Sequence, residues 1–235
     1  MQQLTFLLRR AQRVCETEGP LSLTRRGLAF VSSRFFLYQR WYLAENHYER
    51  SPHVDEPEPV PRVDVTCRVV TGSRMARELE ADGLEFRSST RFVNADRALD
   101  AGAAAICVFA GRELAAISWI ALCQKAKDAF SDPPAKVDFS HGEAWTGGVW
   151  TNPKYRRMGL GAYRFSRMRQ FFLDRGIATS RACVARGNVA ALTGSAKVGD
   201  VIYAKGRYLR VLWWEWWRET PLASTSDSPG SSEGD

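Results

Sequence analysis

The clearest fold signal in this chain is the segment Trp150-Thr-Asn-Pro-Lys-Tyr-Arg-Arg-Met-Gly-Leu-Gly-Ala162. A strand-like apolar run ends here at Pro153, a basic turn with two glycines follows, and residues 163–172 then have the composition of a helix. The first turn of a helix carries unpaired backbone N–H groups and the positive end of the helix dipole, so it binds anions. The segment therefore predicts a cradle for a pyrophosphate.

The side chains of this turn fit that interpretation. Gly159 and Gly161 have no side chain that would keep a phosphate away from the backbone amides. Arg156 and Arg157 add fixed positive charge, and guanidinium groups bind phosphate oxygens well. The predicted phosphate site consists of Arg156, Arg157, Met158, Gly159, Leu160, Gly161 and Ala162.

Two better-known phosphate loops are excluded by the residues after the glycines. A Walker A loop has Lys and then Ser or Thr after its last glycine, whereas Gly161 precedes Ala162 and Tyr163. The dinucleotide fingerprint G-x-G-x-x-G, begun at Gly159, would need a glycine at Arg164. The remaining pattern is R-x-x-G-x-G directly after a strand.

This pattern resembles the signature of the GNAT family of acyl-CoA-dependent N-acetyltransferases, which reads Q/R-x-x-G-x-G/A. In that family V-x-P precedes the signature at the end of the fourth strand. Thr151-Asn152-Pro153 stands at that place here, and threonine for valine is a mild departure because both side chains are β-branched.

A downstream segment resembles the same family. Members carry N-x-x-A-x-x-x-Y-x-K-x-G-F at this distance from the signature. This chain has Ser195 at the tyrosine position and Asp200 at the final phenylalanine position. The matching positions are Asn188, Ala191, Lys197 and Gly199.

The resemblance implies an α/β fold, with a mixed central β-sheet of six to seven strands and helices on both faces. It also implies an acyltransferase, namely an acetyl-CoA-dependent N-acetyltransferase that moves an acetyl or related acyl group directly to a primary amine. Acetyl-CoA or another acyl-CoA would be the co-substrate, and no metal is implied. The acceptor would be a small molecule or a protein, with a small-molecule amine favoured.

By the same resemblance, the strand before the cradle and the strand after its helix splay apart, and the pantetheine arm enters between them. Backbone groups of Val149, Trp150 and Thr151 would hold that arm. Asn188 would bond to it, and Ser195 is grouped with these residues by its position. For Asn188, a cap of the following helix is an equally good interpretation.

A general base is expected on residues 141–151, where alternate side chains share one face. Glu143 is the best candidate, because some relatives carry a glutamate close to this point, and His141 is the second. Burial beside Trp145 would raise the pKa of Glu143 toward useful values. A solvated carboxylate near the start of a strand is the plainer interpretation of Glu143.

The general acid is harder to assign, because the family's tyrosine is replaced by Ser195. An alkyl hydroxyl is a far poorer acid than a phenol. Tyr203 lies nearby in the sequence and is the candidate substitute. Alternatively the thiolate leaves unaided, since a free thiol has a pKa of about 8.5.

The missing tyrosine keeps a different class of function open: a catalytically idle acyl-CoA-binding module whose N-terminal segment contacts a partner or a membrane. The formal net charge of +7 favours an anionic partner: CoA itself, an anionic membrane surface or, as a weaker alternative that rests on charge alone, nucleic acid. We expect no nucleic-acid partner.

Composition is that of a globular protein with one domain and an appendage: 235 residues, 45% hydrophobic and 25% charged. No apolar run reaches about 18 residues, and the N-terminus does not resemble a secretory signal. The five cysteines are widely spaced without a C-x-x-C pair, and the three histidines do not cluster. These features favour reduced thiols, a cytoplasmic location and no metal site.

Four regions are expected along the chain. Residues 1–50 form a helical appendage, because apolar residues recur at helical spacing from Leu4 onward and residues 21–43 are amphipathic and rich in aromatics and arginine. Residues 51–61 are a proline-rich linker, 62–218 are the acetyltransferase domain, and 219–235 are a disordered tail.

The N-terminal helices have two interpretations. Their aromatic residues pack on the catalytic domain or on a second subunit, giving a homodimer, or residues 1–48 make a peripheral contact with an anionic membrane. We favour packing.

Within the domain, strands are expected at residues 62–70, 104–110, 113–123, 141–151 and 178–185, with one or two more in 203–217. Helices are expected at 73–81, 91–100, 163–172 and 189–198, and a loop at 124–136. In the run Val211-Leu-Trp-Trp-Glu-Trp-Trp217, a strand would place tryptophans on both faces. We expect core packing for them, with an aromatic substrate wall or a dimer seam as the alternative.

Overall fold

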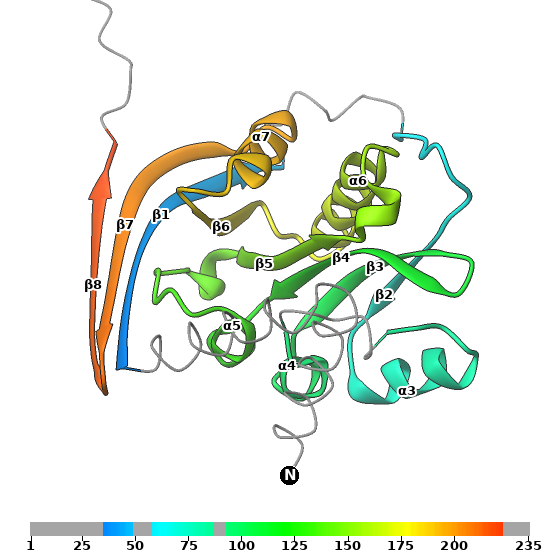
Figure 1. The fold of residues 1–235 in the computed structure, drawn as a ribbon, viewed down its shortest axis with the longest axis horizontal. Coiled ribbons are helices and arrows are strands. Elements are labelled where there is room, and N and C mark those ends of the chain that lie inside the picture. The colour runs from blue at the N-terminus through cyan, green and yellow to red at the C-terminus, as the bar shows by residue number, and fades with distance from the viewer. Residues whose placement is uncertain (1–34, 49–57, 87–92, 223–235) are drawn as a thin grey trace, which may run out of the picture.

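An eight-stranded mixed sheet organises the part of the protein that the structure describes, residues 35–48, 58–86 and 93–222 (Figure 1). The structure is a computed structural model. The strands lie side by side in the order β2-β3-β4-β5-β6-β1-β7-β8. Their bounds are β1 Phe36–His47, β2 Thr66–Val70, β3 Ala104–Ala110, β4 Glu113–Ala121, β5 Glu143–Thr151, β6 Thr179–Ala185, β7 Val201–Val211 and β8 Trp214–Pro221.

Helices cover both faces of the sheet, as predicted. Figure 1 shows α6 and α7 above the sheet and α3, α4 and α5 below it. β5 and β6, which α6 connects, are parallel, and the other neighbouring strands are antiparallel. The helices are α3 Ser73–Ala81, α4 Ala95–Asp100, α5 Gln124–Phe130, α6 Leu160–Leu173 and α7 Val189–Lys197, with 3-10 turns η1 Phe139–His141 and η2 Pro153–Tyr155.

The predicted helix over residues 1–48 is wrong for its last part. Phe36–His47 is strand β1, which lies inside the sheet, antiparallel to β6 on one side and β7 on the other. Leu43 of β1 is fully buried. An aromatic-rich segment suits a strand as well as a helix, and pairing with two distant strands decides between them. β1 also raises the strand count from the expected six or seven to eight.

The described residues test only some of the predicted region boundaries. Residues 1–34, most of the proline-rich linker and residues 223–235 lie outside the described ranges. β8 continues to Pro221, which lies inside the segment expected to be a disordered tail. β1 belongs to the same sheet as the strands that follow the linker.

Most other elements match their predicted positions, and the exception is α5. It occupies Gln124–Phe130, where a loop was expected over residues 124–136. Ala126 and Lys127 are buried in this helix, so burial next to the sheet stabilises a segment whose sequence has a weak helical pattern. Pro133 and Pro134 follow it, in accord with a helix that has already ended.

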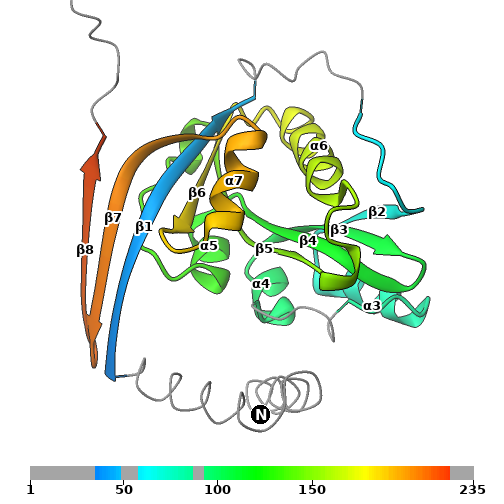
Figure 2. The ribbon, with the colours of Figure 1, turned by 45° about the horizontal axis from the view of Figure 1, so that its top comes forward.

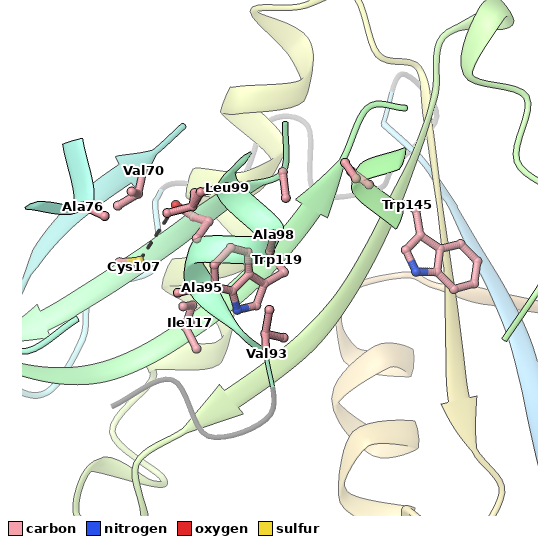
Figure 3. Packing of buried hydrophobic residues seen from close by; sticks show 14 of the residues in the cluster. Val70, Ala76, Val93, Ala95, Ala98, Leu99, Cys107, Ile117, Trp119 and Trp145 are labelled. Atoms are coloured by element: carbon pink, nitrogen blue, oxygen red, sulfur yellow. Dashed lines mark hydrogen bonds between the residues drawn. The ribbon is translucent and has the colours of Figure 1, made fainter. Parts of the chain in front are cut away.

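The main core lies between β3, β4 and the helices α3 to α5. Figure 3 shows Ala95, Ala98 and Leu99 of α4 close to Ile117 and Trp119 of β4. β3 and β4 are buried along nearly their whole length. Apolar residues of α6 form further clusters on the opposite face, so the central strands are covered on both sides.

The tryptophan run is mostly exposed, so the expected core packing is wrong for most of it. Trp213 is 87% exposed and Trp214 is 52% exposed, whereas Trp217 packs against the core. The run forms the end of β7, a two-residue turn and the start of β8. Because β8 is the last strand of the sheet, a neighbouring strand covers it on one side only.

Candidate active site between β5 and β6

β5 and β6 separate in the middle of the sheet. Their parallel pairing ends at Thr146 and Ala182. Beyond that point β5 stays with β4 as far as Thr151, and β6 stays with β1 as far as Ala185. A split therefore opens between the two strand ends, below the face that carries α6 and α7 (Figure 2). The splay implied by the family resemblance is present.

A β-bulge in β5 borders this split. Gly148 and Val149 stand opposite the single residue Ser118 of β4. Gly148 has a φ of 55°, and a Cβ there would lie 2.7 Å from the ring of Trp119, so glycine is required. Val149 is 55% exposed at the bulge. The bulge bends β5 away from β6 and leaves the backbone on that edge without a β6 partner.

Trp150 and Thr151 continue β5 past the bulge. They pair with Ile117 and Ala116 of β4 through one edge of the strand, and their other edge lies past the end of the β6 pairing. With Val149 they form the segment predicted to hold pantetheine, and a contact with that arm stays a prediction.

The first turn of α6 has the features of an anion site. Gly159 is its N-cap with a φ of 81°, and no described side chain caps this turn or adds an acidic group to it. Gly161 is exposed, and a Cβ there would meet nothing within 4 Å. Arg157 has a φ of 64°, a strained conformation of the kind that concentrates at functional sites. The amides that open α6 are thus accessible at its positive end.

Glu113 of β4 anchors the turn that leads into the cradle. Its carboxylate accepts hydrogen bonds from Asn152 Nδ2, Lys154 Nζ and Tyr155 Oη, each at 2.8 Å. The hydrogen bond from Lys154 holds the pKa of Glu113 below its usual range and raises that of Lys154. Because the Tyr155 side chain is also buried, the turn is fixed relative to β4 and hence to the bulge.

The end of the linker and the residues directly after it support the cradle from another side. The N–H of Arg62 donates to the carbonyl of Met158 at 2.9 Å, and Arg167 of α6 lies 2.8 Å from Glu58. A pocket of about 440 Å³ lies between residues 60–65 and Tyr163. These bonds hold the loop around Met158 against residues far away in the sequence.

Asn188 and Ser195 have structural partners. Asn188 Oδ1 accepts a hydrogen bond from the N–H of Ala191 at 3.1 Å, which is the helix cap named as the alternative. Ser195 donates to Asp200, and Asp200 accepts a further bond at 2.9 Å from Asn46 of β1. These bonds fix α7 at the β6 side of the split, and contact of either residue with acyl-CoA stays a prediction.

The two predicted catalytic residues meet at Arg181 of β6. Glu143 Oε1 lies 2.7 Å from Arg181 Nη2, and Glu143 Oε2 accepts the N–H of Asp138 at 2.7 Å. The guanidinium of Arg181 lies 5.2 Å from the centre of the Tyr203 ring. Burial raises the pKa of Tyr203 to about 12, so its hydroxyl keeps a proton at neutral pH. The sequence analysis did not single out Arg181.

The position of Glu143 limits what it can do. It begins β5, roughly 13 Å along the strand before Gly147, where the strands are still paired. A base at this position reaches the split only through water or through a shift of its ion pair. His141, the second candidate, is exposed, and its Nδ1 lies 2.7 Å from Asp138 Oδ2. The role of Glu143 as base stays a prediction.

Two polar groups next to the bulge were missed by the sequence analysis. Arg164 of α6 donates from Nη1 to the carbonyl of Ile117 at 3.3 Å, while its buried Nε has no partner among the described residues. The Oγ of Ser118, a residue 1% exposed, also lacks a described partner. Burial lowers the pKa of Arg164 to about 10.

Unpaired buried donors of this kind are rare in folded proteins, so a polar ligand at the bulge would satisfy both. The signal in the sequence was a basic residue on an apolar helix face. Arg164 follows Leu160 by four positions and precedes Met168 by four, and both of those neighbours are buried.

Two kinds of feature are absent from the described ranges. No helix there combines the length and apolar character needed to cross a bilayer. The same residues contain no group of three or more His, Cys, Asp or Glu side chains placed to hold a metal ion.

Comparisons with known proteins were made by sequence and by structure. No family model and no curated protein matches the sequence. Among solved structures, a GCN5-related N-acetyltransferase from Kribbella flavida is similar, with 18% identity and a TM-score of 0.44 over 78% of this chain and 63% of that one. A tandem GNAT protein from the clavulanic acid biosynthesis pathway has 14% identity and a TM-score of 0.49 over 79% and 55% of the two chains.

A GCN5-related N-acetyltransferase from Sphaerobacter thermophilus has 13% identity and a TM-score of 0.43 over 83% of this chain and 56% of that one. The matched region spans less than two thirds of the length of these three proteins. Two of these three proteins are named GCN5-related N-acetyltransferases and the third is named a tandem GNAT protein. At such identities and TM-scores, activity has to be inferred from the site itself.

Proposed function

We propose that this protein is an N-acyltransferase that moves an acetyl or related acyl group from acyl-CoA to a primary amine. The observation that carries the proposal is the split between β5 and β6, which is bordered by a bulge in β5. The chain runs from the end of β5 through a short turn into the exposed first turn of α6. An acyl-CoA is a thioester on an arm that ends in a diphosphate. It needs an anion site at one end and a strand edge along the arm, and this site offers both.

Residues of this chain account for each part of such a ligand. The amides of residues 160–162 and the side chains of Arg156 and Arg157 bind the diphosphate. The β6-facing edge of β5 beyond Thr146 binds the amides of the arm as an added strand would. Arg164 and Ser118, whose donors lack partners in the described structure, hydrogen-bond carbonyl oxygens of the ligand at the bulge.

The reaction follows from these positions. The neutral amine attacks the thioester carbon, a C–N bond forms, the C–S bond breaks and the thiolate leaves with the electron pair. The amine proton passes to a base, for which Glu143 acting through water is the candidate. Tyr203, with its retained proton, is the candidate donor to the thiolate. Most of the rate enhancement comes from alignment and from donors at the developing oxyanion.

The test is titration calorimetry of the full chain with acetyl-CoA, with release of free thiol measured for a panel of primary amines. Gly161→Leu fills the open space in front of the amides and lowers affinity at least about tenfold. Gly72→Leu is the matched control, since Gly72 precedes α3 and a Cβ there also meets nothing within 4 Å. No heat with acetyl-CoA, together with no effect of Gly161→Leu, contradicts the proposal.

A second candidate is an acyl-CoA-binding module without turnover. The ion pair between Glu143 and Arg181, and the distance of Glu143 from the bulge, favour it. Such a module gains thermal stability from acetyl-CoA in proportion to ligand occupancy but releases no thiol with any amine. Thiol release at a rate that depends on the amine excludes it.

A further inference from the structure

A large apolar patch occupies one end of the outer three strands. Trp213 is 87% exposed, Phe36 is 59% exposed and Trp214 is 52% exposed, far more than is usual for such side chains. The patch is continuous, because Phe36, Val211 and Trp214 are direct neighbours across β1, β7 and β8. This aromatic tip consists of Phe35, Phe36, Tyr38, Val211, Leu212, Trp213, Trp214 and Trp216.

A row of arginines lies next to the aromatic tip. Arg40, Arg207 and Arg218 are direct cross-strand partners on β1, β7 and β8, and all three are exposed. Direct partners share a face of the sheet, so the three guanidinium groups lie together. Each is four residues along its strand from the corresponding residue of the tip, or about 13 Å on the same face. One face of the outer strands is therefore apolar at its end and basic behind it.

The residues in the turn at the aromatic tip are not those that its backbone conformation favours. Leu212 has a φ of 56°, a left-handed conformation in which glycine or asparagine is favoured. It is followed by Trp213, the most exposed tryptophan of the described residues. A strained leucine beside an exposed tryptophan destabilises the free protein, and strained positions of this kind occur where a binding surface needs them.

We propose that the aromatic tip and the arginine row form a docking surface for an anionic lipid bilayer. Tryptophan and tyrosine concentrate at the membrane–water interface, and apolar groups of peripheral proteins enter about 5–10 Å into the boundary between headgroups and acyl chains. Arginines about 13 Å behind the tip then lie at the level of the lipid phosphates, where basic residues attract anionic lipids. The order of side chains along the strands thus follows the polarity profile of a bilayer surface.

Other occupants fit the surface less well. Single-stranded nucleic acid is bound where aromatic and basic side chains are interleaved along one track, whereas here they are separated along the strands. A second copy of the chain would bring its own net charge of +7 toward the arginine row, and like charges oppose such a contact. An anionic bilayer complements both the apolar and the basic part.

The experiment is sedimentation of the full chain with vesicles of phosphatidylcholine alone, or with about a third phosphatidylglycerol, while tryptophan emission is followed. We expect that the chain binds the anionic vesicles, that its tryptophan emission shifts to the blue, and that added salt weakens binding. Trp213→Ser combined with Trp214→Ser weakens binding at least about tenfold. Arg207→Gln combined with Arg218→Gln weakens binding to anionic vesicles about fivefold for each arginine.

Matched controls come from α3, where Met75 is an exposed apolar residue and Arg77 an exposed basic one. Met75→Ser and Arg77→Gln leave vesicle binding unchanged. Acetyl-CoA titration is also unchanged in the tip and arginine variants, so the proposal is tested separately from the catalytic one.

Several results would overturn the proposal. The first is that the chain does not bind vesicles, and the second is that the α3 controls weaken binding as much as the tip variant does. Dissociation of a dimer by the tip variant in ultracentrifugation, without vesicle binding, assigns the surface to a second copy. Binding of a single-stranded oligonucleotide but not of vesicles assigns it to nucleic acid. A large loss of thermal stability in the tip variant alone shows that the tip packs within the chain.

Discussion

The two halves of the sheet are built on different principles. In the half made of β2 to β5, strands β3 and β4 are buried along nearly their whole length and neighbouring strands are close in sequence. In the half made of β6, β1, β7 and β8, strand β1 comes from the other side of the linker, and β8 is exposed at most positions. Local sequence patterns determine the first half, whereas the second half depends on the long-range pairing of β1 with β6 and β7.

The candidate site lies where these halves meet. One wall of the split is β5, fixed by β4, by the bulge and by the bonds of Glu113. The other wall is β6, whose opposite edge is held by β1. The position of the site therefore depends both on the buried half of the sheet and on the pairing of β1 in the other half. A substitution in each half can test its contribution.

The largest expected difference is between two tryptophans, one in each half. Trp119→Ala removes a side chain that is 1% exposed and packs near Phe86 and Phe130, so the free energy of unfolding falls by about 3–5 kcal/mol. Trp214→Ala removes a side chain that is 52% exposed and costs less than about 1 kcal/mol. Urea unfolding followed by circular dichroism measures both. Equal losses would mean that the outer strands are packed as tightly as the centre.

A smaller but more specific effect is expected in β1. Leu43→Ala creates a cavity in a strand that pairs on both edges, and lowers the free energy of unfolding by about 2–4 kcal/mol. Tyr38→Ala on the same strand is the control, because Tyr38 is half-exposed and its loss costs less than about 1 kcal/mol. An appendage that did not belong to the sheet would tolerate both changes in the unfolding measurement.

This contrast also explains how far the sequence could predict the fold. The strands β3 and β4 and the helices α3, α6 and α7 follow from apolar periodicity and glycine breaks, which are local properties. β1 was missed because its partners lie about 130 to 175 residues away in the chain, and its aromatic residues suit either helix or strand. The exposed tryptophans were missed because burial of β8 depends on its place at the edge of the sheet.

The candidate site was predictable to a similar extent. The start of α6 after Gly159 was predictable because glycine spacing and a helix start are visible in the sequence, and binding of a diphosphate there stays a prediction. The helix cap at Asn188 was one of two interpretations that the sequence left open. The pairing of Glu143 with Arg181 depends on strand register between β5 and β6, which the sequence does not display.

At the junction, Arg164→Met separates stability from binding. Arg164 has a buried Nε without a described partner, so replacing it by an apolar side chain of similar length raises the free energy of unfolding by about 1–2 kcal/mol. The same change weakens acetyl-CoA binding several-fold in calorimetry, because a donor at the bulge is lost. Arg77→Met on α3 is the control and changes neither quantity. A variant that is less stable and binds normally would assign Arg164 a purely structural role.

The smallest effect concerns the bonds that fix the cradle to the rigid half. Lys154 holds the pKa of Glu113 below its usual 4.5, so the folded state favours the carboxylate. The stability that this carboxylate contributes is therefore fully present above a pH of about 4.5, and it disappears as the pH falls through the lowered pKa of Glu113. Glu113→Gln lowers the free energy of unfolding by less than about 1 kcal/mol at neutral pH, because the carboxylate is one-third exposed.

Below the pKa of Glu113, the difference in the free energy of unfolding between Glu113→Gln and the unchanged protein disappears. Urea unfolding at two pH values measures this. Glu78→Gln removes an exposed carboxylate paired with Arg74 on α3 and corrects for acid effects shared by all carboxylates. A Glu113→Gln difference that persists unchanged at low pH would assign the anchoring to the neutral hydrogen bonds from Asn152 and Tyr155. The cradle would then be held by geometry alone, with no contribution from the charge of Glu113.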